Sequence, residues 1–376
     1  MILRTLKLQN FRNLSNEYNL SNRINIIVGK NGLGKTNLLE AVSYLASGKS
    51  FRTNYDVFTI KKSLLDIDTI AFSRIEANII DSLGNQIKKE IYIERTGNCN
   101  GNGSKKVLKI DGKRVSLMKF NNRFQSTVFS PNTIDLVINS PATRRSDLDD
   151  FISVFDDSYF DLLAKYRKVV RNRNIIFEKI FERKGKKEEL IFWNKEMYKL
   201  APRIIYLRVS MIDRINKVIK AIGPQMFNLD VDNLSIEYFS KFVKKSKKFK
   251  DITGSFEKKI KQNIEKEIRA GRTLYGPQRE DFIFILNSSN LKDIGSRGQQ
   301  RLFSLLYKLA QWKILKKKTG YPPILLLDDV FSELDKKVQE NLCQYLEEIE
   351  VQTIITTTRL NSLNKKFLIK SRSIKL

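Results

Sequence analysis

The sequence of 376 residues contains no histidine. This absence excludes histidine-based acid–base catalysis, Ser/His and Cys/His nucleophile pairs, and imidazole metal sites. Any chemistry must therefore rest on carboxylates, lysine, backbone amides or a bound divalent cation. The two cysteines are too few for a disulfide framework or a thiolate metal cluster.

Long hydrophobic runs are also missing from the sequence. No apolar stretch approaches the roughly 18 residues of a membrane helix, and charges at Arg4 and Lys7 interrupt any signal-peptide core. We therefore expect a cytoplasmic location. The composition is 41% hydrophobic, 10% aromatic and 29% charged, which is typical of a globular protein, and the length favours two or three folding units.

Acidic residues are scarce relative to basic ones. The 41 Asp and Glu face 69 Lys and Arg, which gives a formal net charge of +28. An excess of this size suggests a nucleic-acid partner. A general drift of composition toward Lys, Ile and Asn is the alternative explanation, so the motifs must decide.

Apolar periodicity predicts an α/β domain built from both ends of the chain, with a helical domain inserted in its middle. The ATPase-like part would comprise residues 1–141 and 271–376, with an antiparallel β region at about 67–129, and the inserted helices would span 142–270. We expect those helices to break near Gly185, Gly223–Pro224 and Thr253–Gly254. Strands are predicted at 2–9, 23–28, 281–286, 323–328 and 351–356, and helices at 36–46, 299–317 and 334–349.

A glycine-rich segment between a predicted strand and a predicted helix fits the pattern G-x-x-x-x-G-K-[ST] without a mismatch. In such loops the backbone N–H groups and the helix N-terminus bind phosphate, the lysine reaches the β- and γ-phosphates, and the hydroxyl binds Mg²⁺. As an exposed loop cation, Lys35 would interact mainly with phosphate, and Thr36 would be the metal ligand. The predicted nucleotide-binding residues here are Gly29, Lys30, Asn31, Gly32, Leu33, Gly34, Lys35, Thr36 and Asn37.

Two carboxylates follow a run of consecutive apolar residues at Ile324–Leu327. Such a run predicts a strand buried on both faces, and its C-terminal end lies where α/β sheets bind ligands. We expect Asp328 to hold Mg²⁺, directly or through water, and Asp329 to polarise the attacking water.

A third segment, Gly295–Arg301, opens a predicted helix and contains Ser296, Gly298 and Gln299. Alone it is only an ordinary helix cap, but its order and spacing relative to Asp328 resemble the signature motif of ABC-type ATPases. That resemblance implies a motif that acts in trans, closing over nucleotide held by another subunit. It also places Asp335 in a D-loop at the dimer interface and Thr357 at the end of the strand where many relatives carry a switch histidine.

The chain as a whole resembles the RecF family of bacterial recombination mediators, which are related to SMC proteins. Arg12 lies in a segment similar to the family's opening strand, where the arginine faces nucleotide phosphate. Gln278, Glu280 and Asn132 depart from the family pattern without touching the phosphate loop or Asp328. The other similar segments are Gly48–Thr53, Phe129–Val137, Arg144–Asp149 and Arg272–Asp281.

The resemblance implies a weak ATPase that binds ATP and Mg²⁺, forms a homodimer with ATP, and uses hydrolysis as a switch. It further implies binding to gapped DNA or single-strand/duplex junctions, and cooperation with RecO and RecR in loading a recombinase. No other reaction and no membrane partner are expected.

Basic residues concentrate in 165–187, where Arg167, Lys168 and Arg171 stand at helical spacing. One basic helix face could follow a phosphate backbone without reading bases, so DNA binding would be independent of sequence. A second cluster spans 241–250 and includes Lys244, Lys245 and Lys247. The alternative for both clusters is an ordinary solvated surface.

Two other classes share the nucleotide motifs. An ABC transporter ATPase subunit is one, but such subunits are usually shorter, lack a long helical insertion and have no obvious use for a charge of +28. Another SMC-like repair ATPase is the second, but an insertion of about 130 residues is too short for long coiled-coil arms.

Overall fold

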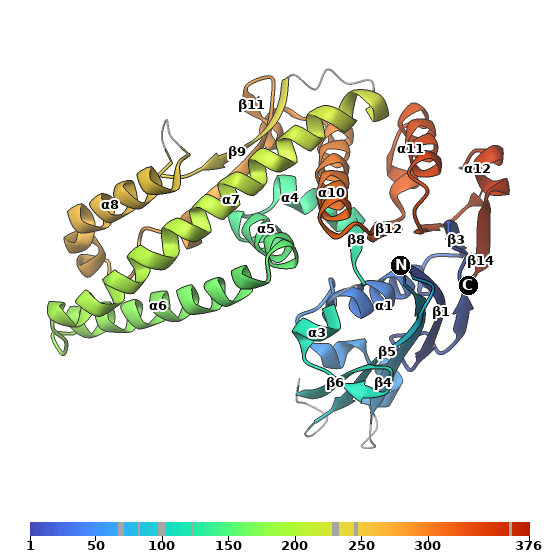
Figure 1. Ribbon diagram of the computed structural model, residues 1–376, viewed down its shortest axis with the longest axis horizontal. Coiled ribbons are helices and arrows are strands. Elements are labelled where there is room, and N and C mark those ends of the chain that lie inside the picture. The colour runs from blue at the N-terminus through green and yellow to red at the C-terminus, as the bar shows by residue number, and fades with distance from the viewer. Residues whose placement is uncertain are drawn as a thin grey trace. The chain divides into compact units, whose positions relative to one another are not determined.

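The computed structural model describes residues 1–66, 71–81, 83–96, 103–121, 124–227, 233–243, 247–360 and 363–376. The chain divides into two compact units, coloured along the sequence in Figure 1. Unit 1 comprises Met1–Thr133, Gln225–Asn228 and Arg301–Leu376, and unit 2 comprises Ile134–Pro224 and Leu229–Gln300. Unit 1 therefore joins both ends of the chain. Residues 134–141 and 271–300 group with the inserted segment, whereas domain boundaries at 142 and 270 stay a prediction.

Unit 1 contains a five-stranded sheet in which every neighbouring pair is parallel, in the order β14-β3-β13-β12-β8. The residues of β12 and β13 are all buried, as runs of Leu, Ile and Thr between covering layers require. Three strands end at the same edge, because β3, β13 and β12 run in one direction. The strands are β3 (Ile24–Val28), β8 (Ser126–Phe129), β12 (Ile324–Asp328), β13 (Thr353–Thr357) and β14 (Ser371–Lys375).

Helices of unit 1 accompany this sheet. Helix α1 follows β3 directly, and its residues 38–46 are buried throughout, so it is enclosed on several sides. The helices are α1 (Lys35–Ser47), α2 (Lys62–Leu65), α3 (Leu117–Asn121), the main part of α10 (Arg297–Thr319), α11 (Lys336–Glu348) and α12 (Lys365–Ile369).

A second, six-stranded sheet of unit 1 is antiparallel, in the order β2-β1-β4-β5-β6-β7. Its inward residues, such as Leu6, Ile75 and Ile91, join a core that also contains Leu45 of α1. Antiparallel pairing ends at β7, because β8 pairs in parallel with β12. The strands are β1 (Ile2–Gln9), β2 (Glu17–Asn19), β4 (Phe72–Ile80), β5 (Gln86–Arg95), β6 (Ser104–Ile110) and β7 (Lys113–Arg114).

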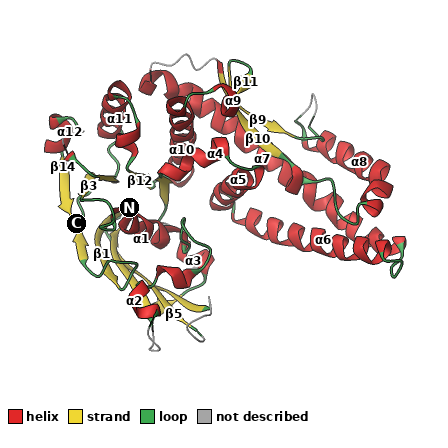
Figure 2. Ribbon diagram, turned by 180° about the vertical axis from the view of Figure 1, so that it is seen from behind, coloured by secondary structure: helices red, strands yellow, loops and turns green. Residues whose placement is uncertain are grey.

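Unit 2 is mainly helical, and its long helices run side by side in Figures 1 and 2. Its elements are α4 (Asp135–Ile138), α5 (Pro141–Phe155), α6 (Asp157–Phe181), the main part of α7 (Leu190–Phe227), β9 (Leu234–Phe239), α8 (Phe249–Arg269), β10 (Asp281–Leu286), β11 (Ser289–Asn290) and α9 (Leu291–Ile294). Strands β9, β10 and β11 form a small antiparallel sheet. Predicted strand 281–286 thus pairs within unit 2 and not in the parallel sheet.

The helices of unit 2 break less often than the glycine and proline pattern predicts. Helix α7 continues through Pro202 and Gly223–Pro224, and α8 continues through Thr253–Gly254. A glycine costs a helix only about 1 kcal/mol, which the burial of Ile252 and Phe256 in α8 outweighs. Although α7 has 38 residues, no helix among the described residues is both long and apolar enough to cross a membrane.

Candidate functional site

The glycine-rich loop joins β3 to α1 at the edge where the parallel strands end. Gly32 and Gly34 have positive φ angles of 85° and 104°, which L side chains rarely adopt. A Cβ atom on Gly34 would also lie 2.6 Å from Oδ1 of Asn13 and 2.9 Å from Cδ2 of Leu14. Glycine is therefore required at this position both for the backbone conformation and for the close approach of the 10–14 turn.

The side chain of Lys35 is buried, which differs from the exposed cation predicted for the loop. Its Nζ donates hydrogen bonds to the carbonyl oxygens of Gly29 at 2.7 Å and Lys30 at 3.0 Å, and to Oδ1 of Asn31 at 3.4 Å. The ammonium group is thus held over its own loop. Leu33 is exposed beside it.

Thr36 and Asp328 meet although 292 residues separate them. The Thr36 hydroxyl lies 3.0 Å from Oδ1 and 2.9 Å from Oδ2 of the Asp328 carboxylate. Burial raises the pKa of Asp328, and hydrogen bonds from Thr356 and Thr36 oppose that rise. A hydroxyl and a carboxylate oxygen are hard donors that suit Mg²⁺, which keeps its remaining positions for water and phosphate oxygens. The pair therefore fits the predicted cation site.

Thr356 is a site residue that the sequence analysis missed. Its hydroxyl donates to Oδ1 of Asp328 at 2.7 Å and accepts from the backbone N–H of Asp329 at 2.9 Å. Its neighbour Thr357, the predicted switch residue, instead donates to the carbonyl oxygen of Arg359. The three consecutive threonines give no sequence signal for which of them faces the carboxylates; strand pairing decides it, since Thr356 lies opposite Asp328.

Asp329 adopts the left-handed backbone conformation, with φ of 48°. Among the described residues its buried Oδ1 has no hydrogen-bond partner. Both features cost free energy, and such costs are concentrated at functional sites. An unpaired carboxylate oxygen next to Asp328 is available to accept a proton or a hydrogen bond from water.

Arg12 and Asn37 lie beside the phosphate loop. The guanidinium of Arg12 donates to both carboxylate oxygens of Glu40 on α1, from Nη2 at 2.8 Å and from Nε at 3.1 Å. Asn37 donates to Oδ1 of Asn13 at 2.7 Å, and Asn13 donates to the carbonyl oxygen of Gly32 at 3.2 Å. Unit 1 therefore brings together all the predicted nucleotide-binding residues with Asp328 and Asp329.

The signature segment lies in unit 2, where it caps the start of α10. The backbone N–H of Gln299 donates to the Ser296 hydroxyl at 3.2 Å, and the backbone N–H of Ser296 donates to Oε1 of Gln299 at 2.9 Å. This reciprocal pair is a capping box. Ser296, Gly298 and Gln299 are all exposed, and a Cβ atom on Gly298 would meet only the Ser296 hydroxyl, at 3.9 Å. Asp335 caps α11 in unit 1 by accepting from the Val338 N–H at 2.9 Å.

Two of the other family-like segments, Arg144–Asp149 and Arg272–Asp281, meet in a buried charged cluster of unit 2. Asp149 accepts two hydrogen bonds of 2.8 Å from Arg208 and one of 2.7 Å from Tyr159. Arg144 forms an ion pair of 2.7 Å with Asp281. Burial raises the pKa of Glu280, whose carboxylate accepts from Tyr238 and Ser240. Gln278 accepts from the Tyr166 hydroxyl, so the departures at 278 and 280 both lie in internal hydrogen bonds of unit 2.

The predicted DNA-contacting residues Arg167, Lys168 and Arg171 are exposed together on α6. Arg173 from the same basic run is fully buried and pairs with Glu267 at 2.8 Å, so it belongs to the core. In the second cluster, Lys244 and Lys245 lie outside the described residues, and Lys247 pairs with Asp213 at 2.7 Å.

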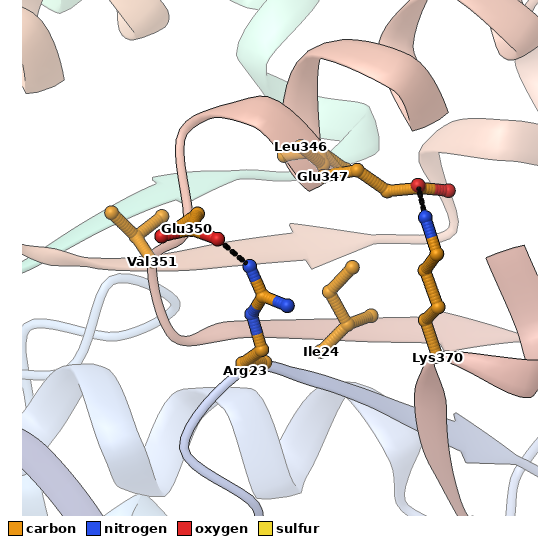
Figure 3. Close-up of a pocket in the computed structure, with 7 residues that line it drawn as sticks. All are labelled: Arg23, Ile24, Leu346, Glu347, Glu350, Val351 and Lys370. Atoms are coloured by element: carbon orange, nitrogen blue, oxygen red, sulfur yellow. Dashed lines mark hydrogen bonds and ion pairs between the residues drawn. The ribbon is translucent and has the colours of Figure 1, made fainter.

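A small pocket of unit 1 lies away from these motifs (Figure 3). Ion pairs of Arg23 with Glu350 and of Lys370 with Glu347 span it. None of the predicted site residues lines this pocket, so it provides no support for a ligand site.

Comparison with known proteins identifies the family. The chain matches the family model described as "RecF/RecN/SMC N terminal domain" over residues 2–372. It is 34% identical over 371 residues to the DNA replication and repair protein RecF of Clostridium kluyveri, covering 98% of this chain and 96% of that protein. The protein of the same name from Natranaerobius thermophilus is 32% identical over 384 residues, covering 99% and 95%.

Solved structures give the same result. A structure described as the recombination mediator protein RecF–ATP in the RecFOR pathway has a TM-score of 0.83 and 30% identity, covering 96% of this chain and 93% of that chain. An SMC head bound to the C-winged helix domain of ScpA has a TM-score of 0.51 and 13% identity, and shares the fold alone. These likenesses confirm the predicted fold class, an ABC-type P-loop ATPase head made from both chain ends with an antiparallel β subdomain and an inserted helical domain. The chain belongs to the RecF family.

Proposed function

We propose that this protein is an ATP-dependent DNA-binding protein of replication and recombinational repair. The observation that carries the proposal is the convergence of Lys35, Thr36 and Asp328 at one edge of the parallel sheet. The full-length similarity to proteins named for DNA replication and repair supports the biological role.

The nucleotide is proposed to be ATP with Mg²⁺, since a similar structure is described as RecF–ATP. The loop amides and Lys35 would bind its phosphates, and Thr36 and Asp328 would hold the cation. Bound Mg²⁺ neutralises phosphate charge in such sites. Asp329 would orient the attacking water through its unpaired oxygen, and weak hydrolysis would serve as a switch.

The dimer is proposed to depend on ATP and on the signature segment of a second copy. Ser296, Gly298 and the first amides of α10 form an exposed helix terminus that suits a phosphate group. Since ADP lacks the γ-phosphate, ATP alone would favour the dimer, as a ligand shifts an equilibrium only by differential affinity. Asp335 and Thr357 would lie in the D-loop and switch segments of that interface.

DNA is proposed to bind through charge and without base recognition, with gapped or single-strand/duplex junction DNA as the preferred form. The net charge of +28 and the exposed Arg167, Lys168 and Arg171 support this. RecO and RecR are the proposed protein partners, because similar structures are described in the RecFOR pathway. A cytoplasmic location follows from these partners as part of the proposal.

The transporter-subunit alternative is not favoured. The match to RecF proteins covers 98% of this chain, including the helical insertion that transporter subunits usually lack. The SMC-like alternative is supported only by the shared head fold, since the sequence identity to an SMC head is 13%.

Sedimentation with a slowly hydrolysed ATP analogue, with ADP and without nucleotide tests the proposal. We expect a dimer with the ATP analogue only, at micromolar protein with gapped DNA present. Ser296→Arg adds bulk beside Arg297 and should prevent dimerisation while ATP binding measured by calorimetry persists. Lys292→Arg, on the exposed end of α9, is the matched control. A Ser296→Arg variant that still dimerises would contradict the trans arrangement.

A further inference from the structure

A buried carboxylate on α1 organises the polar groups beside the phosphate loop. Glu40 is 0% exposed, and its side chain accepts hydrogen bonds from Arg12, Ser50 and Arg52. The Ser50 hydroxyl donates at 2.5 Å and Nη1 of Arg52 at 3.4 Å. Glu40 lies one helical turn after Thr36 on α1, so it faces the same side of the helix as the predicted cation ligand.

The two arginines retain unused donors. Arg12 uses Nε and Nη2 on Glu40, and Arg52 uses Nη1 on Glu40 and Asn37. Among the described residues, Nη1 of Arg12 and both Nε and Nη2 of Arg52 make no hydrogen bond. The side chains are 21% and 40% exposed, so these N–H groups can meet a ligand. One carboxylate against two guanidinium groups leaves a net positive charge there.

This charge lies next to the proposed nucleotide site. Arg12 belongs to the turn that contacts Gly32 and Gly34 through Asn13, and Arg12 itself has a left-handed backbone with φ of 54°. Arg52 donates to the side chain of Asn37, the residue after Thr36, and its charge is one of the groups that oppose the rise in the pKa of Asp328 that burial causes. Two arginines therefore flank the loop and the cation site.

A second carboxylate of unit 1 shows what a purely structural arrangement looks like. Glu90 on β5 also meets two cations, Arg74 at 3.1 Å and Lys109 at 3.1 Å. These three residues form cross-strand pairs within the antiparallel sheet, away from every predicted site residue. Glu40 differs because its partners come from two separate loops, and Asn37, one turn before it on α1, ties both loops to the helix.

We propose that Glu40 is a positioning residue that orients Arg12 and Arg52 toward the terminal phosphate of a bound nucleoside triphosphate. The proposal rests on the proposed function and adds Arg52 as a phosphate-binding cation and Glu40 as the anion that fixes both arginines. Guanidinium groups held in this way bind phosphate oxygens through charge-assisted hydrogen bonds. A diphosphate would lose these contacts.

Calorimetry with a slowly hydrolysed ATP analogue and with ADP tests the proposal on the full chain. Glu40→Gln should weaken binding of the ATP analogue by about tenfold or more, the cost of misplacing a charge-assisted contact, and leave ADP affinity within about twofold. Arg52→Ala, a change at a partly exposed side chain, should show the same selective loss even if Glu40→Gln folds poorly. Glu90→Gln is the matched control and should leave both affinities unchanged.

A variant series separates positioning from a direct role. In an Arg12→Ala/Arg52→Ala background, Glu40→Gln should cause no further loss of ATP affinity, because Glu40 acts only through the arginines. Equal losses for ATP and ADP, or unchanged ATP affinity in both Glu40→Gln and Arg52→Ala, would overturn the inference. Wild-type protein that binds neither nucleotide would instead refute the proposed function.

Discussion

Charged side chains are used differently in the two units. In unit 2, Asp149 is fully occupied by Arg208 and Tyr159, and the buried Arg173 is shared among Glu267, Asn194 and Thr273. In unit 1, residues around the phosphate loop keep polar atoms that could still form hydrogen bonds. One example is Oδ1 of Asp329, which has no hydrogen-bond partner among the described residues.

The difference is the one that the proposed function requires between a structural network and a ligand site. A buried polar atom without a partner costs about 1–3 kcal/mol, and the described residues of unit 1 include such atoms both beside the loop, in Asp329, and on β4, in Ser73. The unpaired oxygen of Asp329 is explained if nucleotide and water supply the missing contacts. The closed pairs of unit 2 are explained by packing, because each pair holds separate helices together.

The largest expected effect is the loss of a closed pair in unit 2. Arg208→Met leaves the carboxylate of Asp149 buried without its cation, which should lower the free energy of unfolding by about 3–5 kcal/mol. Urea denaturation followed by circular dichroism measures this. Arg171→Met on exposed α6 is the control and should cost well under about 1 kcal/mol. Similar losses for the two variants would mean that the buried pair has no special role.

The second prediction concerns unit 1. Lys35→Ala should weaken ATP binding by about a hundredfold, the effect of losing a charge-assisted phosphate contact. The free energy of unfolding should change little, since Lys35 bonds only to its own loop. Calorimetry and urea denaturation give the two quantities, with the exposed Lys61→Ala as control. Unfolding of Lys35→Ala would place this lysine with the structural charges.

The sequence predicts the candidate site correctly where a local residue pattern also marks the end of a strand. The apolar run before Asp328 and the glycines before Thr36 both mark strand ends, and parallel pairing brings these ends to one edge. Predicted strand 281–286 matches β10 residue for residue, but its partners β9 and β11 are set by tertiary packing that alternation does not encode.

Other site residues carry no local signal. Glu40 stands in a helix where a glutamate normally faces solvent, and only the approach of two loops makes it a buried anion. Arg173 looks like the basic residues around it, yet the facing Glu267 on α8 draws it into the core. Long-range partners decide both cases.

The third prediction tests whether the exposed charges of unit 2 bind DNA. Affinity for gapped duplex should fall steeply with salt, because each neutralised phosphate releases counterions. Replacing Arg167, Lys168 and Arg171 by Ala should reduce the slope of log affinity against log salt by up to about 3, at roughly 0.9 per phosphate contact. Fluorescence anisotropy at several salt concentrations measures it. An unchanged slope would identify these residues as solvated surface.

The last prediction concerns Lys89, a buried cation of unit 1 that is satisfied without a carboxylate. Its Nζ donates to the carbonyl oxygens of Leu45 and Phe120, each at 2.7 Å, and lies 3.9 Å from the Phe120 ring centroid. Two carbonyl acceptors satisfy the two N–H donors of a neutral amine. Burial lowers the pKa of Lys89 from 10.5 to about 7, so the folded state favours the neutral form.

Stability should therefore rise with pH through the interval between the two pKa values of Lys89. Below about pH 7 both states carry the proton and the cost of the buried charge is constant; above it, only the unfolded chain stays protonated. The free energy of unfolding should then increase by up to about 1.4 kcal/mol per pH unit. Lys89→Met removes this group, so the difference between wild type and variant should be flat below neutral pH and grow in favour of wild type above it. Parallel pH profiles would show that Lys89 remains charged in the folded protein and that its two carbonyl partners stabilise the ammonium form.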